Sequence, residues 1–261
     1  MKKIILSVAI VAFFAIHAQA QVSIGVRGGF NLNNASILDD DGDKMYIHFG
    51  PRDSLSPGFM PGFQVGLVLD VPIGEIFAIQ PGLLFTTQGA RTSWTEWNRV
   101  GTGFFSRDER YRVSMRFSQI QVPINAQFRF GNDDVAFLLQ AGPYLGLAVG
   151  GRVTEEIQQR QGRSEYHFGE FERVLFGDES EEFELVFRRF DLGLGFGIGV
   201  QVRRFQIGIG YNVSFVNALV QPEVERFNFR RMRWEETTGE RSFRNHGLTF
   251  TVTYLFGGSR F

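Results

Sequence analysis

Asp191, Ser214 and His246 are the residues whose types suit a catalytic triad, and they lie near the ends of three consecutive apolar segments. A serine nucleophile, a histidine base and an orienting carboxylate cleave acyl bonds when the three side chains meet. The alternation described below gives Asp191 and Ser214 the phase of the polar face, whereas His246 has the phase of the apolar face. We therefore expect a histidine at a strand start and no catalytic residue. An enzyme that acts on lipid or peptide at the rim of the fold is the alternative.

Two short motifs resemble cofactor or metal sites. In GLGFGIG (193–199), Ile198 stands at the third glycine position of a dinucleotide-binding fingerprint, and no helix is expected after it. The stretch DDDGD (39–43) resembles the opening of a calcium-binding loop but lacks the properly spaced distal glutamate. We therefore expect a solvated acidic turn at 39–43, and neither a cofactor nor a metal.

A basic and aromatic patch precedes the last apolar segment. Guanidinium groups bind phosphate in a bidentate manner, so such a patch at an outer surface would hold the phosphates of lipopolysaccharide. Pairing with the neighbouring Glu235, Glu236 and Glu240 is the competing interpretation, and the sequence favours it slightly. The patch consists of Arg226, Arg230, Arg231, Arg233 and Trp234.

Period-two alternation of apolar and polar residues runs through the chain and would position these groups. In FDLGLGFGIGVQV (190–202), large apolar residues fill one face and glycine fills most of the other. Eight segments show this pattern, each near the ~10 residues that cross a bilayer at a tilt. We expect an all-β, eight-stranded antiparallel barrel whose bulky face meets lipid and whose glycine face lines a narrow interior. The segments lie at 22–31, 63–71, 77–86, 119–130, 135–147, 190–202, 205–215 and 247–256.

A few larger polar residues occur on the glycine face. In a narrow barrel they would fill the interior as a polar plug. Eight strands normally leave such a filled interior, so a narrow diffusion pore is only an alternative. The expected plug residues are Arg27, Gln64, Gln80, Gln121, Gln127, Arg129, Gln140 and Asp191.

The connections between the segments alternate strictly between short and long. Short, tight turns are expected at 72–75, 131–134 and 203–204, and long loops at 32–60, 89–115, 150–188 and 216–244. Short periplasmic turns and long extracellular loops are the rule in outer-membrane barrels, and most of the charge of this chain falls in the long connections. A soluble β-sandwich or lipocalin-like barrel would instead need its apolar face inside.

The register shifts near the start of the sixth segment. Phe187 is odd-numbered, whereas the outward residues Phe190 and Leu192 are even-numbered. A bulge or bend near Arg188–Arg189 would place Phe187 on the same lipid-facing side.

The beginning of the chain predicts export. Lys2 and Lys3 precede an apolar run from Ile4 to Ile16, and AQA (18–20) suits a cleavage site. We expect a cleaved signal peptide at 1–20, a barrel domain at 21–261 and a location in the bacterial outer membrane. The sequence holds 27 basic and 28 acidic residues and no cysteine, so neither a nucleic acid partner nor disulfides are expected.

Several stretches are similar to known barrel sequences. GFQVGLVLDVPIGEIFAIQPGLLFTTQGAR (62–91), LLQAGPYLGLAVGG (138–151) and FDLGLGFGIGVQV (190–202) resemble strands of the PorT-like outer-membrane β-barrel family of the Bacteroidota. The resemblance covers essentially the whole chain after residue 20. It implies an eight-stranded barrel in the outer membrane, and for the namesake a link to type IX secretion.

The sequence therefore predicts a non-enzymatic outer-membrane barrel with a structural role or a binding role carried by its loops. Its expected partners are outer-membrane lipid and lipopolysaccharide, together with an envelope, secretion or adhesion protein.

Overall fold

The structure is a computed structural model that describes ten stretches of the chain, and all regular structure in them is β-strand. No helix within these stretches is long and apolar enough to cross a membrane. The expected signal peptide (1–20) and the acidic turn (39–43) lie outside the described residues. These are residues 22–38, 58–100, 105–132, 134–161, 164–173, 175–176, 186–218, 223–228, 233–238 and 242–257.

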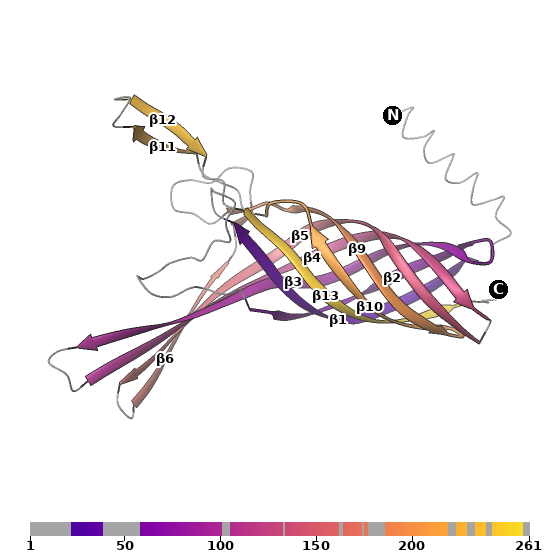
Figure 1. The fold of residues 1–261 in the computed structure, drawn as a ribbon, viewed down its shortest axis with the longest axis horizontal. Coiled ribbons are helices and arrows are strands. Elements are labelled where there is room, and N and C mark those ends of the chain that lie inside the picture. Colours follow the sequence, from indigo (N-terminus) through magenta and orange to yellow (C-terminus); the bar gives the residue numbers. More distant parts are fainter. Residues whose placement is uncertain are drawn as a thin grey trace.

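Eight strands close into an antiparallel barrel in which neighbours follow chain order (Figure 1). The first strand pairs with both the second and the last, and this pairing closes the cylinder. The predicted eight-stranded up-and-down barrel is confirmed. The barrel strands are β1 (Ser23–Leu38), β2 (Met60–Ile73), β3 (Phe77–Val100), β4 (Phe105–Gly131), β5 (Val135–Gln161), β9 (Phe190–Val202), β10 (Phe205–Ser214) and β13 (Ser242–Phe256).

One end of the barrel, here called the turn end, carries the three short connections. The connections β2–β3, β4–β5 and β9–β10 lie there, as predicted. Gly74 and Arg203 have positive φ angles of 80° and 53°, which tight turns between twisted strands require. The start of β1 pairs with the end of β13, since Ile24 lies opposite Phe256, so the first barrel strand begins and the last one ends at the turn end. The opposite end is called the loop end.

Three strands continue far beyond the barrel at the loop end, and this corrects the expectation of irregular loops at 89–115 and 150–188. Strand β3 pairs with β4 as far as Val100 and Phe105, and β5 pairs with β4 as far as Gln161. Strand β6 (Ser164–Arg173) then adds to the outer part of β5. Figure 1 shows these strands leaving the barrel together as a projecting sheet. The sequence did not reveal this sheet, because apolar and polar residues do not alternate in these charged stretches.

Short pairs of strands occupy other parts of the long connections. β7 (Leu175–Phe176) pairs in parallel with β8 (Val186–Phe187), and β11 (Glu223–Asn228) forms a hairpin with β12 (Arg233–Thr238).

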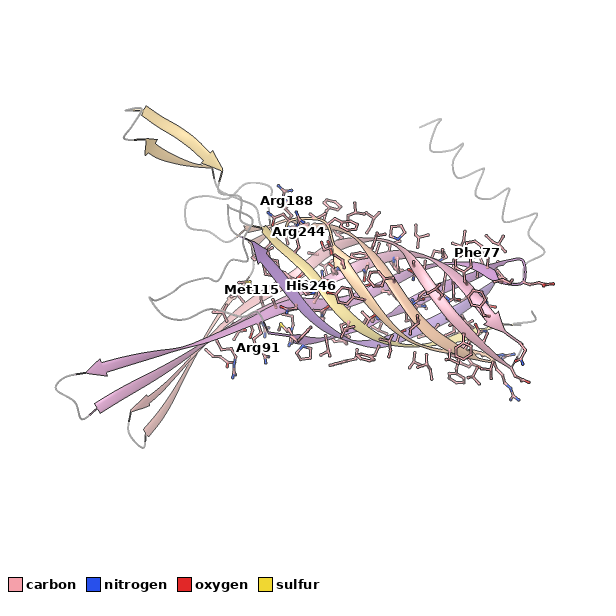
Figure 2. The ribbon with its side chains drawn as sticks, viewed as in Figure 1. Phe77, Arg91, Met115, Arg188, Arg244 and His246 are labelled. Carbon is pink, nitrogen blue, oxygen red and sulfur yellow. The ribbon has the colours of Figure 1, made fainter. Side chains whose placement is uncertain are left out.

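Side chains alternate between the two faces of the barrel wall as the sequence predicted. Along β10, Phe205, Ile207 and Ile209 are about half exposed on the outside, whereas Gln206 is 4% exposed. Figure 2 shows side chains surrounding the barrel between its two ends. Most strand glycines lie on the inner side, where neighbouring groups leave little room: a Cβ on Gly193 would lie 2.5 Å from the phenol of Tyr144. Small residues on the inner face therefore let the few large ones fit.

Candidate functional site

The interior of the barrel toward the turn end holds a continuous network of buried polar side chains. Arg27 donates from Nε to Oγ1 of Thr253 at 2.9 Å, and its Nη2 donates to Oε1 of Gln80. Gln80 in turn donates to Asp70 at 3.3 Å and to Gln206 at 3.2 Å. The fully buried amide of Gln80 thus bonds to three other barrel strands, β1, β2 and β10, and Arg27 extends the network to β13.

The network continues through an ion pair. Arg129 pairs with Asp70, and both side chains are only 5% exposed. Arg129 also donates from Nη2 to Oε1 of Gln127 at 2.7 Å, and Gln206 donates to the same oxygen at 3.4 Å. Gln206 also donates from Nε2 to Oε1 of Gln201 at 3.0 Å. Because a buried charge is costly without a partner, this arrangement requires every member to stay in place.

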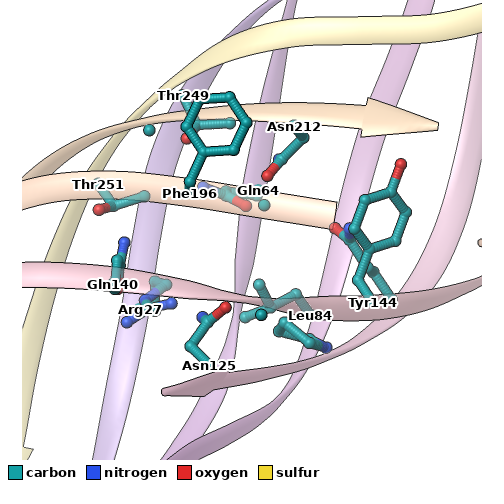
Figure 3. A pocket seen from close by; sticks show the side chains of 15 residues that line it. Arg27, Gln64, Leu84, Asn125, Gln140, Tyr144, Phe196, Asn212, Thr249 and Thr251 are labelled. Atoms are coloured by element: carbon teal, nitrogen blue, oxygen red, sulfur yellow. The ribbon is translucent and has the colours of Figure 1, made fainter. Parts of the chain in front are cut away.

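A small cavity borders the network at Arg27 (Figure 3). Its volume is about 40 Å³, and Gln64, Gln121, Asn125 and Gln140 are among the polar groups in its wall. A water molecule needs about 10–15 Å³ measured in this way, so the cavity has room for a few waters. The wall offers these waters several hydrogen-bonding partners, but the space is too small for most metabolites.

A second polar cluster lies closer to the loop end. Ser214 donates from Oγ to Oδ1 of Asp191. Gln88 donates to Asp191 at 3.4 Å and to Gln119 at 2.7 Å. The carboxylate of Asp191 therefore accepts hydrogen bonds from two neutral donors, Ser214 and Gln88.

His246 does not join this cluster. It lies opposite Val213 on β10, and Nδ1 is 2.8 Å from the hydroxyl of Tyr211. Both rings lie on the outer face of the wall, with centroids 6.0 Å apart. Asp191 and Ser214 thus meet without His246, so these three residues do not form a triad.

Three phenylalanines close the interior at the loop end, a feature that the sequence analysis missed. Phe117, Phe187 and Phe243 are at most 5% exposed, and their ring centroids lie 4.8 to 6.2 Å apart. Ala35 and Ala90 pack against them. We call this group the aromatic cap.

The aromatic cap corrects the expectation that Phe187 faces lipid. The chain does bend at Arg188–Arg189, where it was expected to, but Phe187 points inward. Phe117 has the same odd phase as the inward Gln119 and Gln121. This odd phase was the feature of the sequence that could have identified Phe117 as an inward residue.

The interior also contains apolar groups near the turn end. Val68, Leu84 and Leu255 form a small buried cluster beside the polar network. The inner wall therefore carries apolar as well as polar side chains, whereas a glycine-lined wall filled by a polar plug was expected.

The expected plug residues all lie on the inner face. Six are buried, with at most 6% exposure, and the other two are half-buried. Further buried polar residues that the sequence analysis did not select, including Asp70, Gln201 and Gln206, complete the network. The six are Arg27, Gln64, Gln80, Gln121, Gln127 and Arg129, and the two are Gln140 and Asp191.

The basic patch of the last long connection is only partly described. Arg226 lies opposite Glu235 in the β11–β12 hairpin, and Arg233 lies opposite Asn228. Trp234 lies opposite Phe227. Arg230 and Arg231 lie outside the described residues. Among the described residues, no group of three or more histidine, aspartate or glutamate side chains is placed to hold a metal ion.

The outer surface defines the class of the protein. Large apolar side chains 36–73% exposed surround the barrel on all eight strands, whereas monomeric soluble proteins rarely expose more than a few hundred Å² of contiguous apolar surface. A closed barrel with a polar interior and this apolar exterior is a membrane-spanning β-barrel, because closure leaves no unpaired backbone edge in lipid.

The family follows from the sequence comparison. Residues 17–220 match the model described as "Outer membrane protein beta-barrel domain". The chain belongs to this family, and its location is the outer membrane.

Solved structures with a similar fold have low sequence identity. Ail, the attachment invasion locus protein of Yersinia pestis, solved with the heparin analogue sucrose octasulfate, is 14% identical, with a TM-score of 0.30; the match covers 91% of this chain and 99% of that one. Neisserial surface protein A is 13% identical, with a TM-score of 0.34; the match covers 90% and 99%. No curated protein sequence matches the chain significantly.

Proposed function

We propose that this chain is a non-enzymatic outer-membrane surface protein in which a sealed barrel anchors a sheet that binds a partner outside the cell. The projecting sheet of β3 to β6 is the observation that carries the proposal. On β3, the outward apolar residues end at Phe85, and the strand runs on to Val100. At about 3.3 Å per residue, this part of β3 extends roughly 45 Å past the apolar surface.

The projecting sheet has two strand edges that suit partner binding. Among the described residues, β3 beyond Arg91 pairs with β4 alone, and β6 pairs with β5 alone. A strand edge offers a row of backbone donors and acceptors to which an extended segment adds as a further strand. We infer that the partner is an envelope or secreted protein that presents such a segment.

Several finer assignments form part of this proposal. Residues 1–20 act as a cleaved export signal, and residues 21–261 make up the barrel domain. The PorT-like resemblance supports a link to secretion. The inward polar residues, from Arg27 to Asp191, plug the lumen, and the Arg226–Trp234 patch contacts lipopolysaccharide phosphates.

A pair of register-preserving deletions tests the binding role. Thr92 lies opposite Val113, and Thr154 lies opposite Phe171. Replacing residues 93–112 and 155–170 each by an Asn-Gly turn shortens both hairpins without shifting any strand below them. The trimmed protein should fold and reach the outer membrane as the full-length protein does, because the barrel register is unchanged.

The measurement is site-specific photo-cross-linking in native outer membranes. A cross-linker at position 97, in the outer part of β3, should give a discrete protein adduct, whereas one at Glu75 in a turn-end connection should not. The phenotype of the trimmed strain should equal that of a deletion of the whole gene. A trimmed strain that behaves as wild type would contradict the proposed role, as would the absence of an adduct from position 97 of the full-length protein.

A further inference from the structure

An arginine-rich groove lies on the outer face of the barrel wall, where β3, β4 and β5 leave the apolar band. Its volume is about 580 Å³. Arg91, Arg116 and Arg152 line it, and Glu156 is the one acidic residue in its lining. Ser114, Ser118 and Thr154 contribute hydroxyl groups, and Phe63 and Phe85 form its floor on the barrel side. We call this feature the rim groove.

The phase of the strands places the rim groove on the outside. Phe117 and Gln119 of β4 point into the barrel, so Arg116 and Ser118 lie on the opposite face. Phe63 and Phe85 are exposed lipid-facing residues whose ring centroids lie 5.9 Å apart. A one-residue irregularity opposite Ser118/Gln119 brings Arg152 of β5 onto this same outer face, directly opposite Arg116.

The height of the rim groove matches the boundary between acyl chains and headgroups. On β4, the outward apolar residues run from Phe130 at the turn end to Ile120. About ten residues of a tilted strand cross the hydrocarbon layer. The next outward residues, Ser118 and Arg116, therefore lie at the level of the outer headgroups, above the acyl chains that Phe63 and Phe85 contact.

The rim groove brings three guanidinium groups together on one outer face. Arg116 and Arg152 are directly opposite each other across two paired strands, an arrangement that is unfavourable for like charges. Arg91 lies on the adjacent strand, and its Nε donates to Ser114 at 3.3 Å. Glu156 accepts a hydrogen bond from Arg112 at 3.0 Å. A phosphate bound in the rim groove would be complementary to these guanidinium groups, since arginine binds phosphate with two parallel hydrogen bonds.

We propose that the rim groove binds the phosphate of an acylated lipid of the outer leaflet, with the guanidinium groups of Arg91, Arg116 and Arg152 on the phosphate and the acyl chains on Phe63 and Phe85. Charge complementarity and the depth in the membrane select this occupant. The site is separate from the β11–β12 patch. It is also independent of partner binding by the projecting sheet, because the trimmed protein keeps all five residues.

Lipid titration of the purified full-length protein tests this proposal. The probes are neutral phosphatidylcholine vesicles that carry either diphosphoryl lipid A or its dephosphorylated form, with soluble inorganic phosphate as competitor. We expect Arg116→Gln/Arg152→Gln to weaken diphosphoryl lipid A binding by at least roughly tenfold, because charged hydrogen bonds are lost. The affinity of Arg116→Lys/Arg152→Lys should fall between those of the wild-type protein and the glutamine variant, since lysine keeps the charge without the planar fork.

Matched controls separate the site from general charge effects. Arg188→Gln/Arg244→Gln removes the same charge from exposed positions on the other side of the rim (Figure 2) and should leave binding unchanged. Folding of each variant is checked by heat-modifiable migration on gels. Equal affinity of the rim-groove and control variants would overturn the proposal, as would equal binding of dephosphorylated lipid or full displacement by millimolar inorganic phosphate.

Discussion

Asp70 is the acidic group of the buried network that pairs with Arg129, and it also accepts a hydrogen bond from Gln80. Asp70→Asn keeps the shape but leaves a buried guanidinium without its counter-ion. Removing one partner of a buried ion pair costs roughly 3–5 kcal/mol. We expect a loss of this size in the free energy of unfolding, measured by urea titration in detergent micelles.

Asp134→Asn is the matched control for this substitution. Asp134 pairs with Arg203 at 3.4 Å, but both side chains are about 80% exposed. Exposed pairs contribute only about 0–1 kcal/mol. A loss at Asp70 no larger than that at Asp134 would show that the network does not stabilise the barrel.

Gly193 shows why one inner position must stay small. An added Cβ would lie 2.2 Å from the carbonyl oxygen of Val213 and 2.5 Å from the Tyr144 hydroxyl. Gly193→Ala should therefore lower stability by about 1–3 kcal/mol, as overpacking does. At Gly28, on the outer face of β1, nothing lies within 4 Å of the same added atom. Gly28→Ala should be neutral in the same unfolding assay, and equal losses at both positions would refute the packing argument.

At the scale of elements, the aromatic cap and the polar network occupy opposite ends of the same interior. The rings of Phe117, Phe187 and Phe243 come from β4, β8 and β13, so they tie a segment of the third long connection to the barrel. Phe187→Ala should release this segment and destabilise the loop end. Hydrogen exchange should then increase at the backbone amides of residues 186–190, while the amides of β2 near Asp70 keep their protection. Unchanged exchange at 186–190 would contradict this role of the cap.

Much of the element level followed from sequence, and the exceptions have physical reasons. Alternation identified the strands because one face meets lipid, and this restricts residue type strongly. The outer parts of β3, β4 and β5 carry no such restriction, because both of their faces lie beyond the apolar band. The pairing of these outer parts is therefore seen only in the strand register of the structure.

The interior was predictable in composition but not in pairing. Arg27 and Gln80 were identified from their phase alone. The contact of Asp70 with Arg129 depends on how β2 and β4 lie across the lumen, and no spacing within one strand encodes this. The inward Phe117 broke the simple rule that phenylalanine faces lipid.

At the scale of the whole molecule, the interior of the barrel is filled with side chains on both sides of a small central cavity. The polar network occupies the turn end, and the aromatic cap occupies the loop end. We therefore expect no stepwise ion conductance when the purified protein is inserted in planar bilayers. Regular single-channel openings that persist in preparations free of other porins would contradict the sealed interior.

The most direct test of the account is a single-cysteine scan of β4 from position 114 to position 130, since the native chain has no cysteine. Each variant carries a spin label and is reconstituted in vesicles, where oxygen reports exposure to lipid and a water-soluble nickel complex reports exposure to water. We expect oxygen access with period two at Ile120, Val122, Ile124 and Phe128, and nickel access beginning at Ser118 and Arg116. Nickel access at Val122 and Ile124, with oxygen access at Gln121 and Asn125, would contradict the barrel orientation and every inference built on it.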